Sequence, residues 1–91
     1  MLKLFLLILL KHISTAQCGV GPLTIAPGTT SIPEYEYTNC ADYTGSIIIP
    51  DSVTTIGAQS FFGCTGFTES LIIPESVTNI GYEAFYGCSN I

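Results

Sequence analysis

The second half of this chain repeats itself every 24 residues, and this period limits the folds open to it. The segment SIIIPDSVTTIGAQSFFGC at 46–64 aligns with SLIIPESVTNIGYEAFYGC at 70–88, with Pro50 on Pro74. A unit of this size cannot bury its apolar side alone, so successive units must stack against each other to form a core. The period therefore indicates a repeat architecture.

A degenerate copy precedes these two. Residues 22–45 place Leu23 and Ile25 at the positions of Ile47 and Ile49, although an alanine replaces the proline that follows. The first, second and third copies are defined here as residues 22–45, 46–69 and 70–91.

Each good copy contains one predicted strand. Residues 47–49 are three isoleucines that end at Pro50, and β-branched residues favour strands whereas proline cannot donate to a ladder. We expect Val53 and Ile56 to point inward after the turn. Residues 58–62 are expected to form one helical or 3₁₀ turn.

These features predict an α/β-type repeat solenoid. Short parallel strands, one per 24-residue copy, would stack at about 4.8 Å, and most of the remainder would be turns with short helical or 3₁₀ segments.

The motif I-I-P-x-S-V-T-x-I-G-x-x-x-F-x-G-C resembles the BspA-like, or Treponema-type, leucine-rich repeat family. The resemblance covers residues 46–91 well and 22–45 loosely, and the family's usual unit is one residue shorter between the cysteine and the strand. It implies a secreted or surface-displayed protein that adheres to host matrix proteins or other cells.

The first sixteen residues have the layout of a secretory signal peptide. Lys3 precedes the apolar run 4–10, and small residues at 14–16 predict cleavage before Gln17. A membrane span needs about 20 apolar residues, so this run is too short to be one. The predicted organisation is a signal peptide at 1–16, then an N-terminal cap with the degenerate repeat at 17–45, and two repeats at 46–91.

The charge of the predicted mature chain excludes several functions. Lys3, Lys11 and His12 are the only basic residues of the sequence and all three lie in the predicted signal, so the mature chain keeps all seven acids and no cation. Binding to nucleic acid or to an anionic membrane surface needs cations. Without a histidine or lysine to act as a base, we expect no enzyme, and we expect no cofactor.

The array looks interrupted at its C-terminal end. Residues 89–91 stop partway through the linker that leads to the next strand in the other copies. Two alternatives stay open: a fragment of a longer array, or a short product that pairs its open end with another chain.

Three cysteines recur at one position of the copies and should form a column. Buried free thiols are one interpretation, and a disulfide between neighbours or from the N-terminal cap is another. A straight column without histidine does not suit zinc, so no metal site is expected. The cysteines concerned are Cys18, Cys40, Cys64 and Cys88.

Asp51 and Glu75 occupy equivalent turn positions. Two carboxylates are too few for a calcium shell, and their stacking implies no glycosidase pocket. Solvated turn acids are the favoured interpretation.

The candidate binding residues lie on the strand face. If Ile47 and Ile49 point inward, Ile48 and Ile72 form an outward apolar column; the reversed register stays open as the alternative. The candidate strip comprises Thr24, Ser46, Ile48, Ser70 and Ile72. A second candidate row carries the aromatic residues Phe62 and Tyr86 beside Thr38.

The sequence therefore predicts a secreted or cell-surface module that binds an extracellular protein and serves in adhesion. The alternative is a structural role, in which chains without a specific ligand associate end to end through exposed strand edges.

Overall fold

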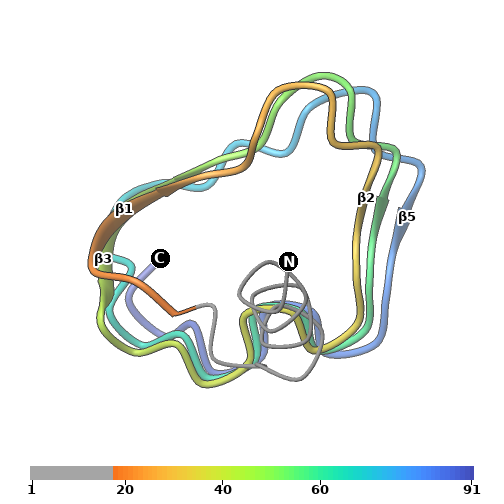
Figure 1. Ribbon diagram of the computed structural model, residues 1–91. Coiled ribbons are helices and arrows are strands. Elements are labelled where there is room, and N and C mark those ends of the chain that lie inside the picture. The colour runs from red at the N-terminus through yellow and green to blue at the C-terminus, as the bar shows by residue number, and fades with distance from the viewer. Residues whose placement is uncertain (1–17) are drawn as a thin grey trace, which may run out of the picture.

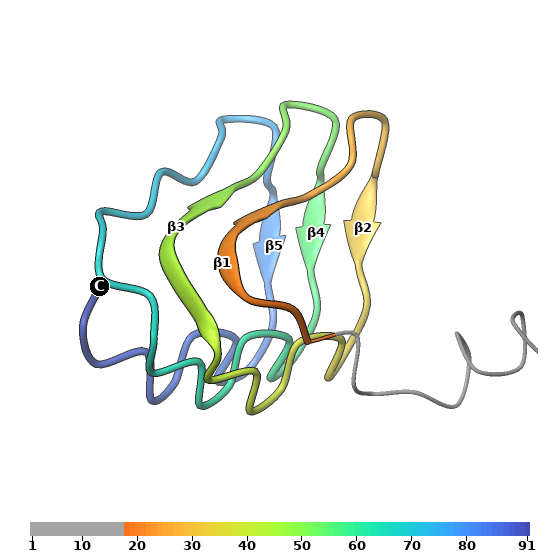
Figure 2. The same cartoon turned by 60° about the vertical axis from the view of Figure 1, so that its left-hand side comes forward.

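The computed structural model describes residues 18–91, which form three stacked copies of one winding path (Figure 1). The signal peptide predicted at 1–16 lies outside the described residues. Seen along the stack, the three copies follow nearly the same outline, and Figure 2 shows them side by side. The predicted parallel-stranded repeat fold, rich in strands and turns, is confirmed.

The strands form two open parallel sheets on opposite sides of the stack. The first sheet contains two strands and the second contains three. The first sheet consists of β1 (Gly21–Thr24) and β3 (Tyr43–Ile48), and the second of β2 (Ser31–Ile32), β4 (Thr55–Ile56) and β5 (Asn79–Ile80). Both sheets keep the 24-residue register, since Leu23 pairs with Ile47 and Ile32 pairs with Ile56.

The second sheet was not predicted from the sequence. Ile56 points inward as expected and is 2% exposed, but its backbone also belongs to a ladder. The ladder continues into the glycine that follows, because the N–H of Gly57 donates to the carbonyl of Ile32 at 2.8 Å. A Cβ on Gly57 would lie 2.6 Å from the backbone nitrogen of Glu34, so only glycine allows this approach.

The predicted helical turn at 58–62 is wrong, because the described residues contain no helix. Gln59 takes a left-handed φ of 53°, which interrupts any helical path. The N–H of Phe61 instead donates to the carbonyl of Ala84 in the next copy, at 2.8 Å. Successive turns with i to i+3 hydrogen bonds take the place of the predicted helix. The α component of the predicted fold class is therefore wrong.

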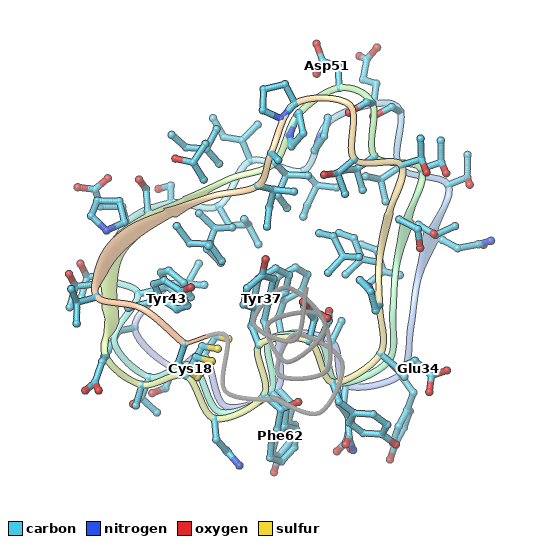
Figure 3. The ribbon with its side chains drawn as sticks, viewed as in Figure 1. Cys18, Glu34, Tyr37, Tyr43, Asp51 and Phe62 are labelled. Carbon is cyan, nitrogen blue, oxygen red and sulfur yellow. A yellow bond between two sulfur atoms is a disulfide. The ribbon has the colours of Figure 1, made fainter. Side chains whose placement is uncertain are left out.

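Aromatic side chains form the centre of the core. Tyr37, Phe61 and Phe85 stack with ring centroids 5.3 and 5.1 Å apart, and Tyr43 stacks on Phe67 at 5.8 Å. In Figure 3 Tyr37 and Tyr43 point into the space enclosed by the copies. Because each aromatic position recurs after 24 residues, each ring meets its equivalent in the next copy.

The strand expected at 71–73 does not form. In the first sheet a register shift lies between Gly21 and Leu23, and Gly45 on the opposite strand takes a φ of 75° there. Gly45 also pairs with Phe67, and this pair starts the same arrangement between the second and third copies. In the third copy, however, the residue equivalent to Gly45 is Glu69, which does not take a positive φ. A left-handed residue with a Cβ costs about 1–2 kcal/mol. The third copy leaves the sheet at Glu69, where the glycine of the preceding copy is replaced.

We predict that Phe61→Ala lowers the free energy of unfolding by about 3–5 kcal/mol. Phe61 is completely buried and stacks on a ring in both neighbouring copies. Tyr86→Ala is the matched control, because Tyr86 is 62% exposed and should cost less than about 1 kcal/mol. Chemical denaturation followed by circular dichroism measures both values, and equal losses would contradict the aromatic core.

Candidate functional site

The strand face of the first sheet exposes an apolar column. Ile48 is 53% exposed and Ile72 is 78% exposed, whereas Ile47 and Ile49 are buried. Thr24 is exposed and pairs directly with Ile48 in the ladder. The side chains therefore alternate in the first of the two registers considered from the sequence, with Ile48 directed outward.

A groove lies on this face between the second and third copies. Its volume is about 430 Å³. It collects four of the five residues of the candidate strip, namely Ser46, Ile48, Ser70 and Ile72. Thr24 is not among its lining residues, so the groove does not extend across β1.

Two acids of the groove were missed as site residues. Asp51 lies three residues beyond the end of β3, and Glu69 lies where the third copy leaves the sheet. Asp51 is labelled at the upper turn in Figure 3. The sequence did contain a signal for Glu69, because a glutamate replaces the glycine of the preceding copy at that position.

The groove opens because the third copy makes no ladder with β3. The N–H groups of Thr68 and Glu69 both donate to the carbonyl of Gly45 at 3.0 Å, which attaches the third copy at the start of β3. Beyond that point, residues 70–73 make no backbone hydrogen bond to any other part of the described chain. Figure 2 shows this segment following an irregular path beside β3.

The aromatic row lies on a different side of the stack. Phe62 is half-buried and Tyr86 is 62% exposed, with their ring centroids 5.3 Å apart in a stacked pair. Figure 3 shows Phe62 directed away from the interior, below the buried rings. The two candidate sites are therefore separate surfaces, and the row contributes no side chain to the groove.

The four cysteines divide into a disulfide and two thiols. Cys18 and Cys40 form the disulfide, which ties the start of the described chain to the first copy. This was one of the pairings left open by the sequence. Cys64 and Cys88 are free, and their sulfur atoms donate to the carbonyls of Tyr37 and Phe61, each at 3.0 Å.

The two thiols also interact with each other. Interaction with the neighbouring Cys88 thiol and, secondarily, burial raise the pKa of the Cys64 thiol above its ordinary value. The same interaction lowers the pKa of Cys88. Cys88 carries the more accessible thiol of the two, because Cys64 is buried and Cys88 is only partly buried.

The acids of residues 18–91 do not gather into a metal centre. Within this range no group of three or more histidine, cysteine, aspartate or glutamate side chains is placed to hold a metal ion. Asp51 and Glu75 are both exposed on their turns.

A family model described as "BspA type Leucine rich repeat region (6 copies)" matches residues 16–91. The chain belongs to the BspA-type leucine-rich repeat family. Comparisons with curated proteins and with solved structures found no significant match. Leucine-rich repeats commonly mediate binding to other proteins, and BspA-type members are typically secreted or surface-displayed. No helix in residues 18–91 is long and apolar enough to cross a membrane.

We predict that iodoacetamide alkylates Cys88 of the native protein at least about tenfold faster than Cys64. The pKa of Cys88 is lowered and its side chain is partly exposed, whereas Cys64 is buried with a raised pKa. Mass mapping of peptides after timed quenching measures both rates. In denaturant the two rates should become equal, and faster labelling of Cys64 in the native protein would contradict these environments.

Proposed function

We propose that this chain is a secreted or cell-surface module that binds an extracellular protein through the strand face of the first sheet. The exposure of Ile48 and Ile72 carries the proposal. Two isoleucines held outward beside a groove lose apolar contact with water only when a partner covers them, and that loss stabilises a complex. Ser46 and Ser70 add polar groups at the same groove.

The disulfide supports an extracellular location. Disulfides persist in oxidising compartments and are rare in reducing ones, so Cys18–Cys40 fits an exported chain. The signal peptide predicted at residues 1–16 and the usual location of BspA-type proteins agree with export.

The charge of residues 18–91 narrows the class of partner. These residues include seven acids and no lysine, arginine or histidine. An acidic surface repels phosphate backbones and anionic lipids, and it attracts basic protein surfaces. The same inventory lacks the histidine or lysine that nucleophilic catalysis by a serine or threonine would need, so we propose a binding role without catalysis.

Adhesion is the role that this proposal favours. Stacked repeats present equivalent surfaces at regular spacing, and a solenoid of such copies would offer several weak contacts to a host matrix protein or a neighbouring cell. Linked contacts raise the overall affinity well above that of a single contact. The proposed biological partner is therefore an extracellular protein of the host or of a neighbouring cell.

Self-association is the second candidate function. Among residues 18–91, β5 is an edge strand of the second sheet, and Ile80 on it is 52% exposed. A strand edge with an apolar side chain can pair with another chain. In this case the chain would build filaments and would need no specific ligand.

We predict that the double substitution Ile48→Glu and Ile72→Glu weakens binding to immobilised extracellular-matrix proteins at least about tenfold. Both side chains are exposed, so the variant should keep the stability of the wild type, and the added charges would have to be desolvated in a complex. Surface plasmon resonance against a panel of purified matrix proteins measures the change.

Tyr82→Glu and Tyr86→Glu together form the matched control, because these exposed side chains lie outside the groove. Binding that survives the isoleucine changes but not the tyrosine changes would contradict the proposed face. Sedimentation of the wild type tests the second candidate. A concentration-dependent increase in mass that Ile80→Lys abolishes would favour self-association over a separate partner.

A further inference from the structure

Within residues 18–91, the edge of β3 that faces the third copy has backbone groups that make no backbone hydrogen bond. The carbonyl of Ile48 accepts a hydrogen bond from the N–H of Ile25 at 2.9 Å, on the β1 side. Backbone groups alternate in direction along a strand, so those of Ile47 and Ile49 point to the groove. The bond equivalent to Ile25–Ile48, from the N–H of Ile49 to the carbonyl of Ile72, is absent.

The opposite wall of the groove is also unpaired. Residues 71–73 make no backbone hydrogen bond within the described chain. An open strand edge of this kind is a template for another extended segment. The volume of about 430 Å³ lies within the range of about 300–1,000 Å³ that is typical of ligand sites.

The side chains of the groove combine apolar and acidic groups. Ile48 and Ile72 are exposed along it, and Asp51 and Glu69 also line it. The two acids lie at opposite ends, because Glu69 is bonded to Gly45 near the start of β3 and Asp51 follows the end of the strand. No cation in residues 18–91 neutralises them.

We propose that the groove binds an extended, basic peptide segment of a partner protein, which adds as a strand to the free edge of β3. The backbone of the segment would pair with Ile47 and Ile49, and its lysine or arginine side chains would meet Asp51 and Glu69. Residues 18–91 of a second copy contain no lysine, arginine or histidine to supply these cations, so the proposed occupant is a segment of a different protein. This inference rests on the proposed function and specifies how that face holds its partner.

The probe for a test is a fluorescent synthetic peptide of about eight residues in which valine and lysine alternate. An extended peptide of this length is longer than β3, which has six residues, so it can reach the whole free edge. Two control peptides carry glutamate in place of lysine, or N-methyl groups on alternate backbone amides. We expect the lysine peptide to bind in fluorescence anisotropy, the glutamate peptide not to bind, and the N-methyl peptide to bind at least about tenfold more weakly, because it cannot pair with a strand edge.

Two substitutions of Glu69 separate the effect of its charge on peptide binding from the effect of closing the groove. Glu69→Gly restores the residue type of Gly45, so the third copy can pair with β3 and close the groove. Glu69→Gln removes the same charge but keeps a Cβ. We expect Glu69→Gly to weaken binding at least about tenfold and Glu69→Gln about threefold or less. Glu34→Gln controls for net charge, because Glu34 lies away from the first sheet in Figure 3.

Each outcome decides the inference. If the lysine and N-methyl peptides bind equally, or if Glu34→Gln and Glu69→Gly weaken peptide binding equally, binding is explained by general charge attraction. Either result would overturn the inference of strand addition. The matrix-protein measurement with Ile48→Glu and Ile72→Glu stays independent. If those substitutions abolish binding while the peptide does not bind the wild type, the proposed face stands and strand addition fails. If they leave matrix binding intact, the proposed function itself fails.

Discussion

Ile32, Ile56 and Ile80 pair in one parallel ladder because each lies 24 residues from the next, and the rest of the structure depends on this register. Parallel pairing at a constant offset brings every side chain against its own equivalent. Rings therefore meet rings, as Phe61 meets Phe85 at 5.1 Å, and backbone carbonyls of one copy meet N–H groups of another. A core of this kind needs no helix to cover it.

The candidate site arises where this register is interrupted. Gly45 takes a left-handed conformation that lets β3 run beside β1, and the third copy has Glu69 at the equivalent position. The third copy stays attached through Thr68 and Glu69 but separates from β3 beyond them. This interruption leaves a strand edge, two outward isoleucines and two acids around one groove.

Much of this fold could be predicted from the sequence, because a repeat forces equivalent residues into contact. Alternation limited the strand to two registers, and the buried Ile47 and Ile49 show that the favoured one is adopted. The second sheet could not be predicted, since strands of two residues are too short to show any alternation. The left-handed conformation of Gln59 could not be predicted either, because glutamine has no particular preference for it. The groove could not be predicted either, because it forms where the third copy does not pair with β3, and the 24-residue period predicts that the two pair.

The most direct measurement of the open edge is amide hydrogen exchange of the free protein. The N–H of Ile25 donates to Ile48, whereas the equivalent N–H of Ile49 and those of residues 71–73 have no backbone partner within the described chain. The structure predicts strong protection at Ile25 and rapid exchange at Ile49 and at 71–73. Protection at Ile49 and 71–73 equal to that at Ile25 would mean that the third copy completes the sheet and that no groove exists.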